Sequence, residues 1–348
     1  MLEIAEHPKV SLVHDRPLNA TLDGAVDFIF DIRQDKEDSG LCQELKESIQ
    51  SACSMKTAMP DLLLWDEEGL RRFEDITRST NYYLTNAEIH ILNENGGNLR
   101  KTNIILQALD ELGYEVGYFA LDVSLPELRR TLRQLPTVSF KHVRCFGLLG
   151  TYDDGRRWLQ QPAILERQKT ILSLGSTLGS FSRRGCAEFL SSFLQPHSSG
   201  KHTQPSFLVG LDGCKDARKV YEAYNDPQGL NRKFIKHGLE RANELLGSNA
   251  FDLSKWDVAG YWDEHKGRHE QNYIALTTVE LNGIPIVANQ TLRATWSHKY
   301  DGDDLAALCR DAGLQVVNKW SSAEQYSVCY LCPTEEDTDR EDVGLGHV

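Results

Sequence analysis

Long apolar runs are absent from this sequence. Its 348 residues contain no stretch close to the roughly 18 consecutive apolar residues of a membrane-spanning helix. The opening residues, MLEIAEHPKVSL, lack the basic and apolar regions of a secretory signal. The eight cysteines are scattered, without the spacing of a disulfide framework. We therefore expect a cytoplasmic protein with reduced thiols and no membrane partner.

Basic residues are in the minority. The chain has 38 Lys and Arg against 51 Asp and Glu, which gives a formal net charge of -13. An acidic protein repels phosphate backbones, so we expect no nucleic-acid partner. Part of the excess lies in residues 333–348, which we expect to form a solvated acidic tail. The chain is 40% hydrophobic, which is enough for a sizeable core.

Strand-like and helix-like runs alternate through the middle of the chain. One helix is predicted near residues 41–53 and more over 61–92, where Thr85 and Glu88 have the spacing of a capping box. Beyond residue 95 come the runs NLRKTNIILQALDELG, EVGYFALDVS, SLPELRRTLRQL, HVRCFGLLG, TILSLGSTLGSF, CAEFLSSFL and SFLVGLDGC. This order is typical of an α/β fold with a mostly parallel sheet covered on both faces.

The alternation of strand-like and helix-like runs stops between about residues 213 and 298. Two helical runs come first, followed by two extended runs joined at Asn282-Gly283, the strongest short-range signal for a hairpin. A helix and two terminal strands then complete the pattern. We see no internal repeat.

Three features fall at the ends of predicted strands, where open parallel sheets bind nucleotides. Gly96-Gly97 precedes a helix, so the backbone can approach a ligand and helix N–H groups are available. Asp122 ends the next strand, where a carboxylate can accept hydrogen bonds from ribose hydroxyls. Gly175 to Gly179 follows a later strand. A plain turn with a solvent-facing aspartate is the alternative interpretation.

The chain resembles a family of S-adenosylmethionine-dependent N-methyltransferases. This family includes the ergothioneine-pathway histidine N-methyltransferases and the fungal dimethylallyltryptophan N-methyltransferases. The strings that carry the resemblance, in order, are FEDITRSTNYYLTNAE, GGNLRKT, YFALDVS, HVRCFGLLGTYDDG, LGSTLGSFSR, DGCKDARKVYEAYND, GRHE and SHKY. The resemblance implies a class I, Rossmann-like methyltransferase fold with an added substrate-binding domain.

The resemblance also implies domain boundaries and site residues. Residues 1–86 and 213–298 would form the substrate-binding domain, and 87–212 with 299–332 the methyltransferase domain. The residues implied to bind S-adenosylmethionine are those of the loop and its helix, the ribose-binding acid and an adenine-flanking pair: Asn95, Gly96, Gly97, Lys101, Asp122, Gly147 and Leu148.

On the substrate side, Tyr82 and Tyr224 are implied to be the catalytic residues, because they would orient the amino acid. Ser297 would line the pocket for the substrate side chain. Ser180 replaces an asparagine that anchors the amino group or carboxylate, and Thr295 replaces the acid that recognises imidazole in the histidine enzymes. Trp296 would suit a large flat side chain, or it packs in the core.

The cofactor loop departs from the family pattern. Asn95 stands at the first glycine position, and the segment before the loop is some fifteen to twenty residues shorter than the family's. Residues 91–94, ILNE, would have to serve as the strand that precedes the loop, and a strand normally needs about five residues.

We therefore expect methylation of the α-amino group of a tryptophan-derived amino acid, such as 4-dimethylallyltryptophan. Histidine is the alternative substrate, and a non-catalytic relative with an impaired cofactor loop is the third possibility. No metal is expected. Cys329 and Cys332 have no partner pair, and Gly267 interrupts the helical spacing of His265 and His269.

Overall fold

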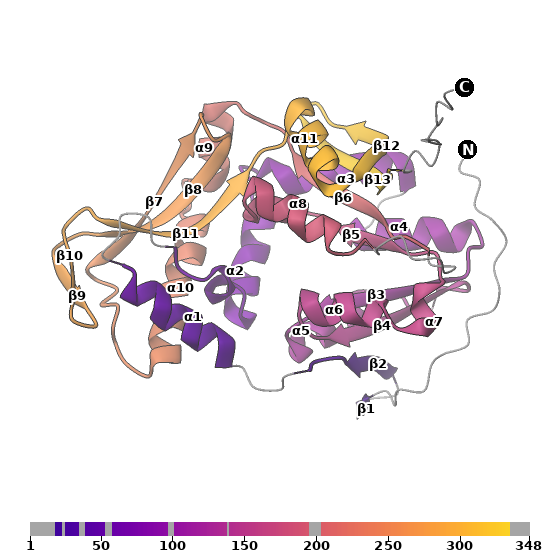
Figure 1. Cartoon of the computed structure of the whole chain (residues 1–348), viewed down its shortest axis with the longest axis horizontal. Coiled ribbons are helices and arrows are strands. Elements are labelled where there is room, and N and C mark those ends of the chain that lie inside the picture. The colour runs from indigo at the N-terminus through magenta and orange to yellow at the C-terminus, as the bar shows by residue number, and fades with distance from the viewer. Residues whose placement is uncertain are drawn as a thin grey trace, which may run out of the picture.

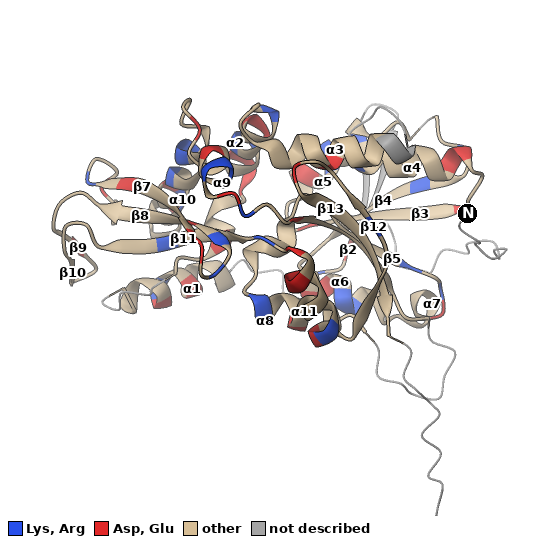
Figure 2. Ribbon diagram, turned by 90° about the horizontal axis from the view of Figure 1, so that it is seen from above, with Lys and Arg blue, Asp and Glu red and all other residues tan. Residues whose placement is uncertain are grey.

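The computed structural model describes residues 18–22, 25–34, 39–52, 58–96, 101–137, 139–194 and 203–334. The molecule consists of an antiparallel lobe on the left of Figure 1 and two further sheets on the right. Acidic and basic residues are interspersed along the helices (Figure 2). None of the described helices combines the length and apolar character that crossing a membrane requires.

The left lobe is built on a three-stranded antiparallel sheet with the order β11-β8-β7 and a small hairpin, with helices against it. The hairpin turns at Asn282-Gly283, as the sequence predicted. The lobe comprises α1 (Ser39–Gln50), the 3-10 helix η1 (Asp61–Leu64), α2 (Glu67–Arg78), α9 (Ala217–Tyr224), α10 (Leu230–Leu246), β7 (Trp256–Asp263), β8 (Arg268–Ala275), β9 (Val279–Leu281), β10 (Ile284–Ile286) and β11 (Thr291–His298).

The lower right part of Figure 1 is a four-stranded sheet with the order β1-β2-β4-β3. Strand β4 runs parallel to both β2 and β3, and β1 closes one edge by antiparallel pairing. Its elements are β1 (Leu18–Leu22), β2 (Ala25–Asp31), α4 (Lys101–Glu111), β3 (Val116–Asp122), α5 (Leu125–Gln134), β4 (Val143–Leu149), α6 (Tyr152–Leu159) and α7 (Pro162–Leu165).

The upper right part is a second four-stranded sheet with the order β12-β13-β6-β5. Strands β5 and β6 are parallel, and the terminal strands β13 and β12 continue the sheet in antiparallel pairing. Its elements are α3 (Tyr83–Gly96), β5 (Thr170–Ser173), the 3-10 helix η2 (Thr177–Ser180), α8 (Arg183–Ser191), β6 (Ser206–Asp212), α11 (Gly302–Ala312), β12 (Leu314–Ser321) and β13 (Tyr326–Pro333).

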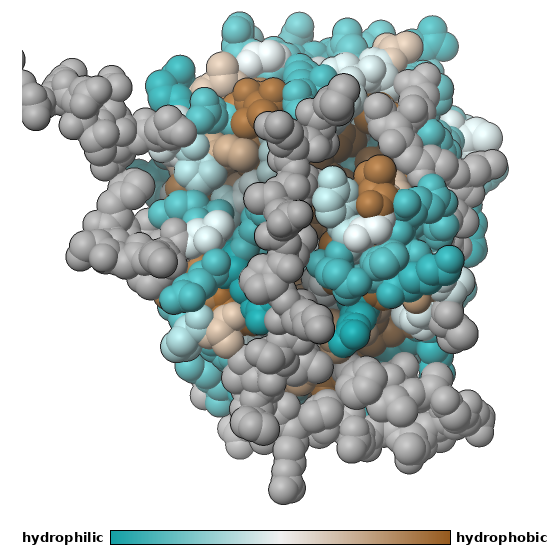
Figure 3. All heavy atoms as spheres, turned by 90° about the vertical axis from the view of Figure 1, so that its right-hand side faces the viewer, coloured by the Kyte–Doolittle hydropathy of each residue, from teal (hydrophilic) through white to brown (hydrophobic). Residues whose placement is uncertain are grey.

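The predicted parallel sheet is therefore interrupted. Among the described strands, none pairs with the outer edge of β3 or of β5. A cavity of about 2270 Å³ is lined by both of these strands together with parts of β4, α4 and α6. Strands of parallel sheets are normally buried and paired, because unpaired backbone groups away from water are unfavourable. Hydrophobic side chains appear between hydrophilic ones on the side of the molecule shown in Figure 3.

The chain segment at this interruption is helical. Residues 91–94, which would have to serve as the strand before the loop, continue helix α3, as predicted for residues 61–92, and Ile91 and Leu92 are buried in the core. Only residues 97–100, which lie outside the described residues, separate α3 from α4. Among the described residues, no strand lies between α3 and α4.

The capping box was also wrong. Helix α3 begins at Tyr83, so Thr85 and Glu88 lie inside it. The Glu88 side chain is fully buried and accepts hydrogen bonds from the Tyr326 hydroxyl (2.7 Å) and the Gly175 amide (2.8 Å). Its carboxylate therefore connects α3 to the second sheet instead of capping its own helix.

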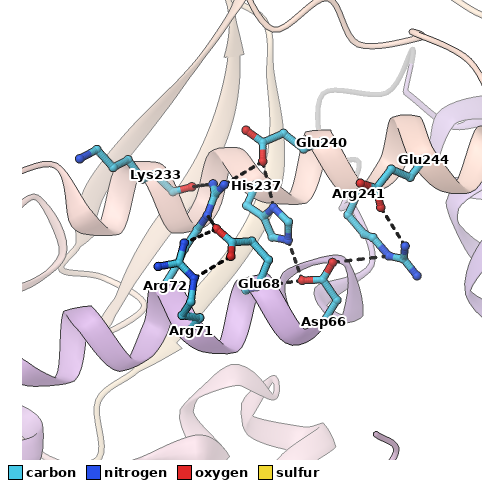
Figure 4. A network of polar contacts seen from close by, with 10 residues as sticks. Asp66, Glu68, Arg71, Arg72, Lys233, His237, Glu240, Arg241 and Glu244 are labelled. Carbon is cyan, nitrogen blue, oxygen red and sulfur yellow. Dashed lines mark hydrogen bonds and ion pairs between the residues drawn. The ribbon is translucent and has the colours of Figure 1, made fainter. Parts of the chain in front are cut away.

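Ion pairs connect α2 and α10 in the left lobe (Figure 4). The two ring nitrogens of His237 face carboxylate oxygens of Asp66 (2.6 Å) and Glu240 (3.0 Å), and Arg72 pairs with Glu240 (3.1 Å). His237 is only 4% exposed, and Asp66 also caps α2 by accepting from the Gly69 amide. The network fixes the first turn of α2 against α10, which holds the lobe's helices in place around η1.

Replacing Gly210 with alanine is expected to destabilise the protein by about 1–3 kcal/mol, because overpacking forces neighbours to move. A Cβ at Gly210 on β6 would lie 1.9 Å from a Glu88 carboxylate oxygen and 2.5 Å from the Tyr326 hydroxyl. The matched control is Gly302→Ala, where a Cβ would meet nothing within 4 Å. Urea unfolding measures both variants, and equal stabilities would contradict the expected clash.

Candidate functional site

Two of the residues predicted to bind the cofactor line the large cavity. Asp122 ends β3, where its carboxylate accepts from the Ser124 amide (2.7 Å), and burial raises its pKa. Leu148 on β4 lines the same cavity. Gly147 does not: a Cβ at this position would face Ile29 and Leu132 at 3.0 and 3.3 Å, because successive residues of a strand point to opposite faces.

The predicted cofactor loop falls largely outside the described residues. Asn95 and Gly96 are the last residues of α3, and Gly97 is not described. Lys101 is the first residue of α4, and its ammonium pairs with the buried Glu88 carboxylate at 2.7 Å. This places Lys101 beside the turn at Gly175, whose Cβ position lies 3.5 Å from the Lys101 ammonium. The roles of these residues toward a cofactor stay predictions.

The structure brings Tyr82, Tyr224 and Ser297 together, although they come from three separate regions of the chain. The rings of Tyr82 and Tyr224 are 5.8 Å apart in an edge-to-face arrangement, and the Tyr224 hydroxyl donates to Ser297 (2.8 Å). Burial raises the pKa of both phenols, so both stay protonated at neutral pH. The Tyr224 ring also stacks on His269 with centroids 4.6 Å apart.

His269 is held neutral in this cluster. Burial, and the charge of nearby Lys299, lower its pKa to about 3. Its side chain is almost completely buried and lies within 3.2 Å of the Asn225 amide. The ring therefore supports Tyr224 by stacking and carries no charge near pH 7.

A buried ion pair beneath the phenols was missed by the sequence analysis. Lys299 and Asp212 are both fully buried and lie 2.7 Å apart. The Lys299 ammonium also donates to the hydroxyls of Tyr224 (2.9 Å) and Ser297 (3.2 Å), and Tyr83 donates to Asp212 (2.6 Å). Because an ammonium can only donate, Tyr224 must accept from it, and the Tyr224 proton points to Ser297. Both charged residues belong to the quoted strings SHKY and DGC, so a charge at the end of an apolar strand was the available signal.

Ser180 and Thr295 lie together in a second, smaller cavity of about 200 Å³. The Ser180 hydroxyl donates to the Thr177 carbonyl (2.8 Å), so it is bound within its own turn. The remaining lining residues are Glu44, Ala58, Met59, Pro60, Asp61, Arg293 and Trp296. Asp61 was not predicted from the sequence, because it is remote from every motif that carried the resemblance.

Trp296 is occupied by protein groups. The guanidinium groups of Arg268 and Arg293 lie 4.0 and 3.8 Å from its ring centroid, and its indole N–H donates to the Ser180 carbonyl (2.5 Å). Of the two interpretations given to this residue, the structure supports packing, because two cations cover the ring that a flat substrate would need.

Helix η2 lies between the two cavities. Thr177 and Leu178 line the large cavity, and Ser180 lines the small one. Ser297 and Thr295 project from the same face of β11, because side chains alternate along a strand. The phenol cluster, the small cavity and the large cavity are therefore consecutive neighbours, an arrangement that can hold an amino acid next to a cofactor.

An α/β core with parallel strands, terminal antiparallel strands and an acid at a strand end defines the class of S-adenosylmethionine-dependent methyltransferases. The family described as "Histidine-specific methyltransferase, SAM-dependent" matches residues 41–334, and the chain belongs to this family. Its cofactor is S-adenosylmethionine.

Similar proteins carry names that refer to different pathways or substrates. The chain is 41% identical to "Ergothioneine biosynthesis protein 1" of Neurospora crassa over 78% of this chain, but it spans only 33% of that protein. It is 32% identical to "N-methyltransferase imqF" of Aspergillus flavus, over 85% of both chains. It is 31% identical to "4-dimethylallyltryptophan N-methyltransferase easF" of Arthroderma benhamiae, over 84% of this chain and 93% of that protein.

Proposed function

We propose that this chain transfers a methyl group from S-adenosylmethionine to the α-amino group of an amino acid with a nitrogen-containing aromatic side chain. One observation carries the proposal: Tyr82, Tyr224 and Ser297 lie together, and Ser297 is two residues along β11 from Thr295, which lines the small cavity. In this arrangement the phenol cluster holds the amino-acid backbone and the cavity receives its side chain. The domain boundaries given above belong to the same proposal, except that residues 18–22 and 25–31 form β1 and β2 of the sheet that carries Asp122.

The residues lining the large cavity fit the cofactor on one side. S-adenosylmethionine, when bound, supplies a methyl group that is activated by its sulfonium. A carboxylate at a strand end, Asp122, fits the ribose hydroxyls, and the apolar wall that includes Leu148 fits the adenine. On the other side of the cavity the sheet is interrupted, as described above.

The protein's role in the reaction is to position the amine. An ammonium has no lone pair, so the amine must lose a proton before its nitrogen attacks the methyl carbon, as the carbon–sulfur bond breaks. The pKa values of Tyr82 and Tyr224 are raised, so both phenols keep their protons and cannot act as bases. The pKa of His269 is lowered, so its ring stays neutral and is a poor proton acceptor. They orient the substrate, and the proton goes to water.

Two substrates follow from the sequence and the relatives. A tryptophan-derived amino acid was expected because Thr295 replaces an acid, and several relatives are named for dimethylallyltryptophan. Histidine is supported by the family description and by the relative named for ergothioneine. The interrupted sheet supports the third candidate, a relative that binds an amino acid without methylating it.

Incubating the purified protein with S-adenosylmethionine and each amino acid, followed by mass spectrometry, tests the proposal. We expect a mass increase of one or more methyl groups, located on the α-nitrogen by fragmentation. Amino-acid binding without methyl transfer would select the non-catalytic candidate. Neither binding nor transfer would reject the proposal.

Replacing Tyr224 with phenylalanine is expected to weaken amino-acid binding about tenfold. A lost hydrogen bond to a charged group is worth roughly 1.5 kcal/mol or more, and 1.4 kcal/mol corresponds to a factor of ten. The matched control is Tyr221→Phe on the same helix, because Tyr221 is 49% exposed. Isothermal titration calorimetry measures both, and equal affinities would contradict the role of the Tyr224 hydroxyl.

A further inference from the structure

Asp61 occupies a position that the sequence motifs do not mark. It begins η1, directly after Pro60, and lines the small cavity together with Thr295 and Ser180. The segment before it is fixed to β11, because the Met59 amide donates to the Arg293 carbonyl (2.8 Å) and Ala58 pairs with Arg293 in a parallel bridge. Asp61 is therefore placed beside β11 by backbone contacts, and its position does not depend on a flexible surface loop.

The surrounding protein stabilises the ionised form of the Asp61 carboxylate only in part. The Thr295 hydroxyl stabilises it by hydrogen bonding, and Arg293 contributes at longer range. Desolvation and the neighbouring Glu44 outweigh these contributions and raise its pKa to about 6. The Arg293 guanidinium lies over the Trp296 ring, 3.8 Å from its centroid. A ligand that brings a positive charge or a strong N–H donor would complete the environment of this carboxylate.

The rest of the cavity suits a ring. Ala58, Met59 and Pro60 supply apolar lining, while Thr295 and Ser180 supply the polar side next to β11. Asp61 itself is an exposed residue, so the cavity is open to an incoming ligand. Polar and apolar groups both contribute to the lining, so the cavity suits a small ring that carries nitrogen atoms.

We propose that Asp61 is the specificity-determining residue of the amino-acid site, and that it selects a substrate with a basic ring in its side chain. This rests on the proposed function, because the amino acid must lie across the phenol cluster for its side chain to reach the cavity. A protonated or N–H-donating imidazole makes a charge-assisted hydrogen bond to Asp61, whereas an indole cannot carry a positive charge. Thr295, on β11, stands where the resemblance places the acid of the histidine enzymes, and its hydroxyl contacts the Asp61 carboxylate. In this chain the acid that recognises the ring would therefore come from η1 instead of from β11.

The test is calorimetric binding of L-histidine and L-tryptophan to the full chain at pH 7.5. We expect histidine to bind more tightly. Asp61→Asn, which keeps the shape of the side chain, should weaken histidine binding at least tenfold and change tryptophan binding less than twofold. Glu47→Gln is the matched control, because Glu47 is an exposed carboxylate on α1 that does not line the cavity, and it should change neither affinity more than twofold.

A rescue variant separates selection from general damage. In Asp61→Asn with Thr295→Glu, a carboxylate returns to the cavity from β11, and histidine binding should recover by at least fivefold. Tighter binding of tryptophan than of histidine by the unmodified chain would overturn the assignment, as would Asp61→Asn leaving histidine affinity unchanged. If neither amino acid binds, the proposed function itself fails. If both bind and only the Asp61 variant has no effect, the proposed function stands without this selection.

Discussion

Insertion of a strand-forming segment of about twenty residues between Gly96 and Lys101 is expected to raise the affinity for S-adenosylhomocysteine at least a hundredfold. Ligands of open α/β sheets bind across the carboxyl ends of neighbouring strands. Here the strand ends that carry Asp122 and the turn at Gly175 belong to separate sheets, with a cavity of about 2270 Å³ between their edges.

The physical reason is preorganisation. A strand between β3 and β5 would pair their free backbone edges and hold both strand ends at a fixed separation. Without this strand, a ligand must itself hold Asp122 and the turn at Gly175 at the right separation. The free energy of ordering them then reduces the binding free energy of the ligand. A hundredfold change corresponds to about 2.7 kcal/mol, a modest share of such ordering.

Calorimetric titration with S-adenosylhomocysteine measures the effect in three proteins: the chain itself, the variant with a segment from a family member, and a control of equal length made of glycine and serine. The control remains a flexible coil and should not gain affinity. Equal affinity in all three would show that the interruption does not impair the cofactor site. Sequencing of transcripts across the region encoding residues 88–97 would show whether a longer form of the chain exists.

Replacing Lys299 with methionine is expected to destabilise the protein by about 3–5 kcal/mol, because it leaves the Asp212 charge buried and unpaired. Both side chains are fully buried, and their ion pair connects β6 to the end of β11. The same change removes the donor to Tyr224 and Ser297, so the phenol cluster loses the group that sets the direction of its hydroxyl protons.

Two further variants identify the cause of this loss. Lys215→Met removes a more exposed ion pair with Asp301 and Asp304, and should cost about 1 kcal/mol or less. Adding Asp212→Asn to Lys299→Met removes the unpaired charge and should recover part of the lost stability. Urea unfolding gives the free energies. A Lys299→Met variant no less stable than Lys215→Met would contradict the importance of the buried pair.

Local patterns in the sequence predicted most of the regular structure. The strand ending at Asp122 follows from its alternating apolar residues and lies at Val116–Asp122, and the hairpin turn at Asn282-Gly283 follows from backbone preferences. The helix after Ser124 begins with a proline in its first turn, as expected. These features depend on neighbours within a few residues, which the sequence displays directly.

Errors occurred where distant residues compete with local preference. Thr85 and Glu88 have the spacing of a capping box, but Glu88 is bound by Tyr326 and Gly175, which are remote in the chain. Residues 91–94 were the only stretch left for the strand that the fold needs before the loop, yet Ile91 and Leu92 are buried as part of α3. The core around Ile91 and Leu92 is built from several helices and strands. The residues at 91–94 alone therefore do not show that they pack into it.

The class of fold and the family could be assigned from residue type and order alone, and the same motifs supplied the predicted site residues. Only the tertiary structure decided that Lys299 and Asp212 meet beneath the phenols, that Asp61 lies beside Thr295, and that the sheet is interrupted between β3 and β5. Each of these is a relation through space between residues far apart in the chain. Burial and pairing set their energies, and both arise only when the chain has folded.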